Sequence, residues 1–191
     1  MILLAALLLG LLAGVGRARW QKRPYRAPDL RFIWLAVVAF LPQLILVYLP
    51  ATHHLLPDWF AGALLSASLI IFLAFIWVNR RLPGMPILLA GMALNLVVML
   101  SNGGWMPISP ATASHLAGGG SIEASSLGGR FGAKDVLLPP EQTRLAFLSD
   151  RFLLPDWSPY KVAFSLGDIV IAVGAFWVLA RARTEDEREA E

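Results

Sequence analysis

Long apolar runs separated by short polar segments dominate this chain. Five runs hold at most one charged residue each, and they cover Met1–Gly16, Phe32–Pro50, Trp59–Val78, Pro86–Ser101 and approximately Val162–Ala180. A helix that crosses a bilayer needs about 20 mostly apolar residues, within a range of about 17–25. The first and fourth runs are short, so their flanks must contribute or the local bilayer must adapt. The pattern predicts an all-α, polytopic membrane bundle of about five transmembrane helices.

The composition agrees with a membrane location. Of the 191 residues, 57% are hydrophobic and 15% are charged, whereas an ordinary soluble domain is about 45–50% apolar and about 25% charged. Apolar side chains beyond what one core can bury need another solvent, and lipid provides it. The chain contains no cysteine, which excludes disulfide bonds, thiol catalysis and cysteine-ligated metals. We therefore expect an integral protein of the lipid bilayer.

The first apolar run has two interpretations. A signal peptide carries positive charge before its apolar stretch and small residues at a cleavage site after it. Here the basic residues follow the run instead, and they are Arg17, Arg19, Lys22, Arg23 and Arg26. This order is typical of an uncleaved helix with its N-terminus outside, which we prefer to a cleaved signal.

The positions of lysine and arginine predict the orientation of the helices. Short cytoplasmic loops are enriched in these two residues. The segment Arg17–Arg31 contains six of them, the turn Asn79–Arg81 two and the tail 181–191 three, whereas the turn Ala51–Pro57 contains none. The whole chain, 1–191, is then one membrane domain with its N-terminus outside, its C-terminus inside and a cytoplasmic tail.

The segment Asn102–Lys161 is the longest stretch outside the apolar runs. We predict that it is an extracytoplasmic loop, because long segments cross the membrane largely regardless of their charge. Its many glycine and proline residues argue against long regular elements. We therefore expect an irregular loop with one short helix around Glu141–Asp150 and a mobile stretch near Ala117–Gly132.

A helix-capping motif precedes the apolar part of the last run, where Ser165 is followed three residues later by Asp168. In such a capping box, each side chain accepts a hydrogen bond from the backbone N–H of the other residue. Asp168 thus has a structural interpretation. The alternative is a membrane-edge acid that binds a ligand or a proton, because ionisable residues within spans are functional candidates. We favour the cap.

Several polar and small residues predict contacts between helices. Asn95 lies near the middle of the fourth run, where a buried amide needs a hydrogen-bond partner on another helix. Gln43 is a candidate partner, or a substitute donor for the backbone freed by the adjacent Pro42. We interpret both amides as packing residues rather than ligands. Gly10 and Gly14 form a Gly-x-x-x-Gly row, which indicates a close helix contact.

Motifs of catalysis and of cofactor binding are missing from the sequence. It contains no Gly-x-x-x-x-Gly-Lys-Ser/Thr phosphate loop and no Gly-x-Ser-x-Gly elbow. The three histidines, His53, His54 and His115, have no carboxylate spaced to complete a metal site. We therefore predict no metal, no cofactor, no catalytic residue and no nucleic-acid partner. The basic inner segments are interpreted as a signal of topology rather than as a site for anionic lipid.

Two outer motifs resemble a known family. The segment Asn102–Pro107 reads Asn-Gly-Gly-Trp-Met-Pro, and Phe164–Asp168 reads Phe-Ser-Leu-Gly-Asp. Together they are similar to the domain-of-unknown-function family 5317. The resemblance covers nearly the whole chain, including the glycine-rich first helix and the turn Asn79–Gly84. It implies a bacterial plasma-membrane protein and it implies no activity.

Both motifs lie on the outer face in the predicted topology. One follows the fourth helix and the other begins the fifth, so the motifs converge if these two helices are neighbours. The resulting hypothesis is a ligand-binding site formed by Asn102, Gly103, Gly104, Trp105, Ser165 and Asp168.

Three functions are compatible with these features, and we rank them in this order. First, a non-enzymatic accessory or scaffold subunit would bind a membrane-protein partner through its helix faces and outer loop. Second, a small transporter or lipid-binding protein would need a polar cavity, which Asn95 and Asp168 line only sparsely. Third, a membrane enzyme would act on a lipid-linked substrate through Asp58, Asp156 or Asp168. Clustered outer carboxylates would favour the enzyme, and a sealed interface with Asn95 paired would contradict the transporter.

Overall fold

The structure is a computed structural model, and it describes residues 2–48, 55–120, 126–132, 134–155, 157–158 and 160–181. Its five longest helices each fall on one of the predicted apolar runs. They are α1 (Ile2–Trp20), α2 (Ile33–Tyr48), α4 (Asp58–Val78), α5 (Met85–Ser101) and α7 (Leu166–Ala180). The fold is therefore mostly helical, as the sequence predicts.

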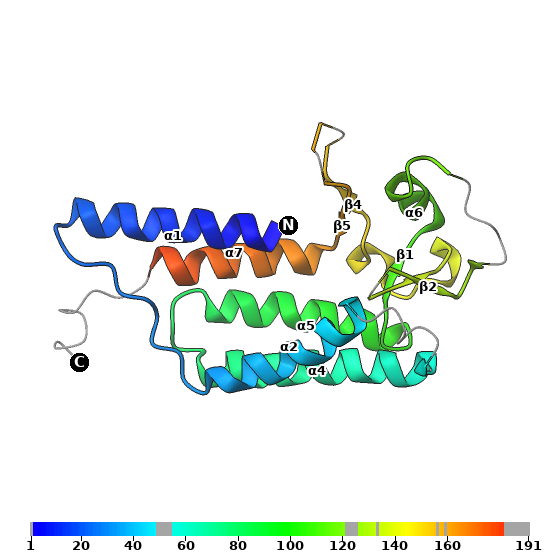
Figure 1. The fold of residues 1–191 in the computed structure, drawn as a ribbon, viewed down its shortest axis with the longest axis horizontal. Helices are drawn as coiled ribbons and strands as arrows, with labels where there is room; N and C mark the ends of the chain where they lie inside the picture. The colour runs from blue at the N-terminus through cyan, green and yellow to red at the C-terminus, as the bar shows by residue number, and fades with distance from the viewer. Residues whose placement is uncertain are drawn as a thin grey trace.

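The five long helices lie side by side and run back and forth between two ends (Figure 1). Helices α1, α4 and α7 run in one direction, and α2 and α5 run in the other. One end carries the folded segment between α5 and α7, and we call it the cap end. The other end carries the connection from α1 to α2, the turn from α4 to α5 and the last residues of α7. We call it the basic end because arginines are concentrated there.

Two of the helices, α1 and α4, are long and apolar enough to cross a membrane by length and composition. Only 22% of the apolar window in α1 and 44% of that in α4 is buried within the protein. The core helix of a soluble domain would be buried over most of its surface. Three shorter apolar helical segments accompany them, namely Ile33–Leu46, Met85–Ser101 and Leu166–Ala180.

Glycines allow α1 to pack directly on α7. A Cβ atom on Gly10 would lie 2.7 Å from the carbonyl oxygen of Phe176, and one on Gly14 would collide with the carbonyl oxygen of Leu179. Such close approach of backbones is a common source of packing energy between membrane helices. The contact predicted from the Gly-x-x-x-Gly row is therefore confirmed, and α7 is the partner helix.

Glycines also bring α5 and α7 together. A Cβ atom on Gly91 would lie 2.7 Å from the backbone nitrogen of Ile171, and one on Gly174 would lie 2.6 Å from the backbone nitrogen of Leu88. These contacts make the two helices antiparallel neighbours, which is the condition that the predicted ligand site requires.

Polar side chains join α2 to α4. Gln43 Nε2 donates to Ser68 Oγ at 2.7 Å, and Ser68 Oγ donates to the carbonyl oxygen of Ala39 at 2.6 Å. Pro42 lies inside α2, where it removes one backbone donor from the helix. Gln43 is thus a packing residue, as predicted. Its pairing with Asn95 is wrong, because Asn95 bonds to α7 instead.

The segment between α5 and α7 folds into a small cap. Its elements are β1 (Met106–Ile108), α6 (Pro110–Leu116), β2 (Arg130–Phe131), β3 (Asp135–Leu137), the short 3-10 helices η2 (Pro140–Gln142) and η3 (Ala146–Leu148), β4 (Phe152–Leu153) and β5 (Ala163–Phe164). Strand β3 pairs in parallel with β1 and antiparallel with β2, while β4 pairs antiparallel with β5. Ile108, Ala113 and Leu137 form the core of the cap.

The cap differs from the predicted irregular loop. The all-α class does not hold for this segment, because β1 and β3 pair as strands, with all three residues of β1 and the apolar Val136 and Leu137 of β3 buried. The helix expected around Glu141–Asp150 is replaced by η2 and η3. Leu145, just before η3, has φ +55°, and this left-handed conformation interrupts a right-handed helix. Of the stretch Ala117–Gly132 that was expected to be mobile, residues 121–125 lie outside the described residues.

Candidate functional site

A group of charged and polar side chains lies where the cap meets α5 and α7. We call it the lysine–carboxylate cluster, and its members are Asn95, Lys134, Asp135, Asp150, Ser165 and Asp168. Helix α5 contributes one member, the start of β3 two, the segment after η3 one, and the start of α7 two. The antiparallel packing of α5 on α7 places Asn95 beside the first turn of α7.

The predicted capping box forms at the start of α7. Ser165 Oγ accepts a hydrogen bond from Asp168 N at 3.0 Å, and Asp168 Oδ2 accepts one from Ser165 N at 3.2 Å. Asn95 completes the arrangement, because its Nδ2 donates to Asp168 Oδ1 at 2.8 Å and its Oδ1 accepts from Ser165 Oγ at 2.9 Å. Gly167 leaves room for this amide, since a Cβ atom there would collide with Asn95 Oδ1.

Lys134 connects the three carboxyl groups of the cluster. Its Nζ donates a hydrogen bond to Asp150 Oδ2 at 2.7 Å. The same Nζ lies 3.9 Å from Asp135 Oδ1 and 3.9 Å from Asp168 Oδ2. One ammonium group therefore faces two carboxyl groups of the cap and one of α7, and it joins the cap electrostatically to the helix pair.

The cluster extends from the protein surface into its interior. The side chain of Asp150 is 1% exposed and that of Asp135 is 15% exposed, compared with 29% for Asp168 and 44% for Lys134. Within the described residues, Asp135 Oδ1 and Asp150 Oδ1 are buried and accept no hydrogen bond. Solvent therefore reaches the cluster mainly at Lys134 and Asp168.

Burial changes the protonation of the two cap carboxyl groups. Burial raises the pKa of Asp135 to about 7, against the attraction of Lys134 and with added repulsion from Asp150. Burial also raises the pKa of Asp150, again opposed by Lys134. Desolvation lowers the pKa of Lys134, but the attraction of the three carboxyl groups outweighs it, so this pKa is raised. The cluster thus combines a cationic lysine with two carboxyl groups that hold their protons more tightly than an exposed aspartate does.

This arrangement can bind and release a proton near neutral pH, since two buried carboxyl groups close together cannot both ionise easily. The Ser165 hydroxyl is fully buried and donates to an amide rather than to a base, so it is not an activated nucleophile. In the described part of the chain, no group of three or more His, Asp or Glu residues is arranged to bind a metal ion. The cluster can therefore gain or lose a proton at the contact between the cap and the helices α5 and α7.

Asn102 lies outside this cluster. Its Nδ2 donates to the carbonyl oxygens of Val98 at 2.7 Å and of Arg144 at 2.9 Å. Its Oδ1 accepts from the backbone nitrogen of Arg144 at 3.0 Å. Asn102 therefore ends α5 and attaches the segment before η3 to that helix.

The Gly-Gly-Trp part of the same motif packs against the start of α4. Gly104 has φ +88°, and a Cβ atom on it would lie 2.5 Å from the carbonyl oxygen of Gly62. Trp105 Nε1 donates to the carbonyl oxygen of Asp58 at 3.1 Å. The Arg130 guanidinium lies 4.9 Å from the centre of the Trp105 ring and pairs with the Asp58 carboxylate at 2.5 Å. The motif thus fixes the cap on α4.

The predicted ligand-binding residues are consequently divided between two places. Ser165 and Asp168 lie together in the lysine–carboxylate cluster, whereas Asn102, Gly103, Gly104 and Trp105 lie where the cap contacts α4 and α5. Within the described residues, no hydrogen bond or ion pair joins the first group to the second.

Lys134, Asp135 and Asp150 were not predicted as site residues from the sequence. All three lie in the segment expected to be an irregular loop, where acidic and basic residues are equal in number. One available signal was the position of Lys134 and Asp135 directly before the apolar run Val136–Leu138, because such a run can mark a buried strand. Three other residues singled out from the sequence lie outside the described residues, namely His53, His54 and Asp156.

Comparisons with known proteins bear on the family alone. No curated protein and no solved structure matches the chain. The model of a family of unknown function, DUF5317, matches residues 28–180. This range includes α2 to α7 and both outer motifs, and it leaves out the glycine-rich α1, which the expected resemblance included. The chain belongs to this family of unknown function, DUF5317.

Proposed function

We propose that this protein is a non-enzymatic accessory or scaffold subunit in the plasma membrane of a bacterium. Five helices would cross the bilayer, with the N-terminus and the cap outside and the basic end inside. The cap and the exposed helix faces would bind a membrane-protein partner. The observation that carries the proposal is a contrast: the amide side chains of Gln43 and Asn95 inside the bundle bond to side chains of neighbouring helices, whereas large apolar side chains cover its outside.

Exposed apolar side chains support the membrane location. Leu8, Leu9 and Leu12 on α1, and Ile33 and Val37 on α2, are all more than half exposed. Removing apolar surface from water is favourable by about 25 cal/mol per Å². Exposing whole apolar helix faces to water would therefore cost free energy, and the hydrocarbon core of a bilayer removes that cost.

Charges and tryptophans support the proposed orientation. At the basic end, the Arg80 guanidinium lies 4.6 Å from the Trp77 ring centre, and that of Arg181 lies 4.9 Å from the Trp177 ring centre. Arginine is enriched on the cytoplasmic side, and tryptophan is enriched at headgroup level. The packing of α1 on α7 supports a first helix that is kept rather than cleaved.

The paired interior favours a scaffold over a solute transporter. Asn95 bonds to Ser165 and Asp168, and Gln43 bonds to Ser68. A pathway for ions or protons usually shows several intramembrane ionisable groups that face a cavity. Here Asn95 and Gln43 instead stabilise helix contacts.

One observation favours a membrane enzyme as a second candidate. Asp135, whose pKa burial raises to about 7, belongs to a cluster with two further carboxyl groups, and a pKa near the working pH suits acid–base catalysis. Asp150 is too buried to reach a substrate, so Asp168 and Lys134 would be the contact groups. This candidate predicts that Asp168→Asn reduces the protein's cellular function far more than its loss of stability explains. The scaffold predicts a loss only in proportion to instability.

Site-specific photo-cross-linking in the native host tests the scaffold proposal. A benzophenone amino acid replaces Leu12 on α1, Val37 on α2 or Phe147 on the cap, all of which are exposed. The matched control carries it at Gln21, an exposed position at the basic end. All four variants are compared at equal expression, with and without illumination.

We expect a defined adduct with one protein at the cap or on one helix face, and no such adduct at Gln21. Lipid adducts alone on the helices, together with no protein adduct at the cap, would contradict the scaffold proposal. Equal protein adducts at every position, Gln21 included, would show random collision and would also contradict it.

A further inference from the structure

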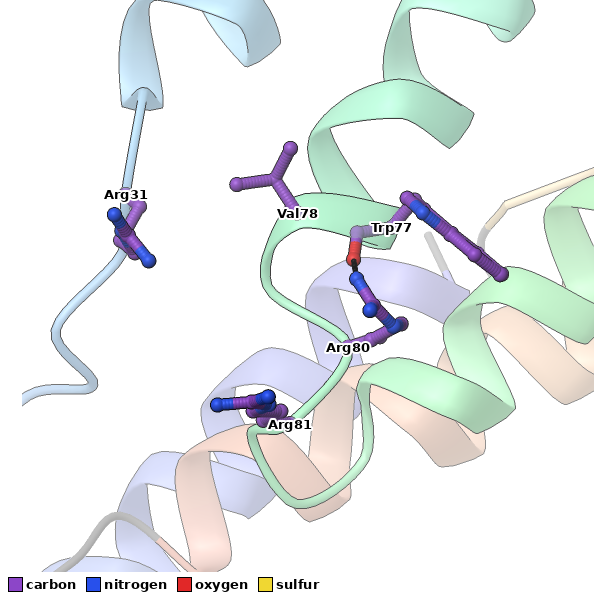
Figure 2. A pocket seen from close by; sticks show the side chains of 5 residues that line it. All are labelled: Arg31, Trp77, Val78, Arg80 and Arg81. Carbon is purple, nitrogen blue, oxygen red and sulfur yellow. Dashed lines mark hydrogen bonds between the residues drawn. The ribbon is translucent and has the colours of Figure 1, made fainter.

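A hollow lined by arginines opens at the basic end of the bundle (Figure 2). Its volume is about 450 Å³, and its lining residues are Arg31, Trp77, Val78, Arg80 and Arg81. They come from the connection before α2, the last turn of α4 and the turn between α4 and α5. Sites for small ligands typically measure about 300–1,000 Å³, so the hollow is large enough for a lipid headgroup.

A buried asparagine fixes the geometry of this hollow. Asn79 Nδ2 donates to the carbonyl oxygen of Arg31 at 2.9 Å, and Asn79 Oδ1 accepts from the backbone nitrogen of Arg31 at 2.8 Å. The same Nδ2 also donates to the carbonyl oxygen of Phe75, in the last turns of α4, at 2.9 Å. The side chain of Asn79 therefore holds the connection before α2 against the end of α4.

The arginines of the hollow have no acidic partner in the described part of the chain, where no carboxylate forms an ion pair with Arg31, Arg80 or Arg81. Arg80 is positioned by Trp77, since its Nη1 donates to the Trp77 carbonyl oxygen at 3.0 Å while its guanidinium lies against the indole ring. Guanidinium groups present paired N–H donors that match the oxygens of a phosphate. A bound phosphate would relieve the mutual repulsion of the three cations.

We propose that the hollow binds the phosphate group of an anionic phospholipid in the inner leaflet. The inference rests on the proposed membrane location with the basic end inside. It goes beyond the interpretation of these charges as a signal of topology, because the structure places three of them around one cavity.

Two observations favour a lipid over a free anion. Trp77 at the rim is 55% exposed, and tryptophan is enriched at the level of the lipid headgroups. An exposed apolar stripe also continues from Trp77 along α4, with its members spaced three or four residues apart, and it consists of Ala63, Ala67, Ile70 and Ala74. These apolar side chains, three of which are alanine, offer an acyl chain a surface on the helix that also carries Trp77.

Native mass spectrometry of the full chain in mild detergent tests the proposal. The protein is titrated with phosphatidylglycerol, with phosphatidylcholine of the same acyl chains, and with inorganic phosphate. The test variant combines Arg31→Gln with Arg81→Gln, and Arg80 stays in place because it is tied to Trp77. The control variant combines Arg19→Gln with Lys22→Gln, which removes two charges from the same end but outside the hollow. Thermal unfolding confirms that both variants are folded.

We expect the wild type to bind phosphatidylglycerol more tightly than phosphatidylcholine. The test variant should lose about 30-fold in affinity for phosphatidylglycerol, or about fivefold for each guanidinium, and the control less than about threefold. Equal binding of the two lipids by the wild type would overturn the proposal whatever the variants do, and so would equal losses in the two variants. If inorganic phosphate displaces the lipid at an equal concentration, the hollow is a site for a free anion, and the proposal of a lipid site is overturned.

The same experiment distinguishes this inference from the proposed function. A chain that stays monodisperse without detergent would contradict the membrane location itself. A detergent-dependent chain without lipid preference would contradict only the lipid site. A co-purifying protein in the same spectra reports on the scaffold proposal, independently of which lipid is bound.

Discussion

Asn95 on α5 donates a hydrogen bond to the Asp168 carboxylate on α7 at 2.8 Å, and the other oxygen of that carboxylate lies 3.9 Å from the Lys134 ammonium of the cap. Three parts of the molecule therefore meet at one carboxylate. The capping box of α7 would form without Asn95, but the amide adds a partner on the neighbouring helix. This makes the junction between cap and bundle depend on a few polar side chains.

Loss of the Asn95 amide should destabilise the protein. We expect Asn95→Leu to lower the free energy of unfolding by about 1–3 kcal/mol, because the Ser165 hydroxyl loses its acceptor and Asp168 loses a donor in a mostly buried site. Ser101→Ala is the matched control on the same helix, since among the described residues the Ser101 hydroxyl bonds to the Val97 carbonyl, one turn before it, and to no residue of another helix. Denaturant unfolding in detergent measures both. Equal effects of the two substitutions would contradict the assigned role of Asn95.

The raised pKa of Asp135 predicts that stability depends on pH. The pKa is about 7 in the folded protein and 3.8 for an unperturbed group, so the folded cap retains a proton that the unfolded chain releases between these values. The stabilisation is fully present below about pH 4 and is lost as the pH rises towards 7, by at most about 1.4 kcal/mol per pH unit for one proton. Asp150 shifts in the same direction, and the Lys134 charge opposes both shifts.

Hydrogen exchange of the β3 amides between about pH 5 and pH 8, corrected for intrinsic rates, measures this dependence. We expect protection to fall as the pH rises in the wild type, because the ionised carboxyl group destabilises the folded cap. Asp135→Asn should flatten the profile, whereas the exposed control Glu141→Gln should leave it unchanged. A profile of Asp135→Asn identical to that of the wild type would disprove the assignment of the proton to this residue.

The close contact of α1 with α7 can be tested with two glycines of α1. A Cβ atom on Gly14 would collide with the Leu179 carbonyl oxygen and lie 2.7 Å from Tyr25 Cε2, whereas one on Gly16 would have no atom within 4 Å. We expect Gly14→Ala to destabilise by about 1–3 kcal/mol. Gly16→Ala should be neutral or stabilise by up to about 1 kcal/mol through helix propensity. Thermal midpoints that fall equally for both would count against the contact.

The Asn-Gly-Gly-Trp motif offers a second matched pair. Gly103 and Gly104 both have positive φ angles, of +74° and +88°, but a Cβ atom on Gly104 would meet the backbone of Gly62, whereas one on Gly103 would have no atom within 4 Å. Alanine at either position costs about 1 kcal/mol, because a residue with a Cβ atom is disfavoured in a backbone conformation with positive φ. At Gly104 the added methyl group would also push the cap away from α4. Gly104→Ala should therefore lower stability more than Gly103→Ala, and limited proteolysis of the cap should accelerate for Gly104→Ala alone. Equal proteolysis rates would argue against this contact.

The helices were predictable from the sequence because a run of apolar residues such as Trp59–Val78 has few alternatives to a helix. The capping box was predictable for a similar reason, since Ser165 and Asp168 lie within one turn. The partner of Asn95 was not, because spacing along one helix does not reveal which neighbour it faces. Gln43 was an equally reasonable candidate until the packing of α5 on α7 was known.

The strands of the cap could not be predicted from the sequence. They are two or three residues long, too short for a periodic pattern, and β1 pairs with β3 across a long intervening segment. Lys134 and Asp150 come together because the backbone of each bonds to β1, so their ion pair has no local signal. The arginines of the basic end were visible in the sequence, but their arrangement around one hollow depends on the hydrogen bonds that Asn79 makes with Arg31 and Phe75.

In the proposed topology, the bundle crosses a membrane with the cap outside and the basic end inside. The chain contains no cysteine, so single cysteines can be placed at Ala111 in the cap and at Gln21 at the basic end, both exposed. A membrane-impermeant maleimide is applied to spheroplasts before and after permeabilisation. We predict that Ala111→Cys is labelled in both cases and that Gln21→Cys is labelled only after permeabilisation. Labelling of both positions in intact spheroplasts, or the reverse pattern, would contradict the proposed topology.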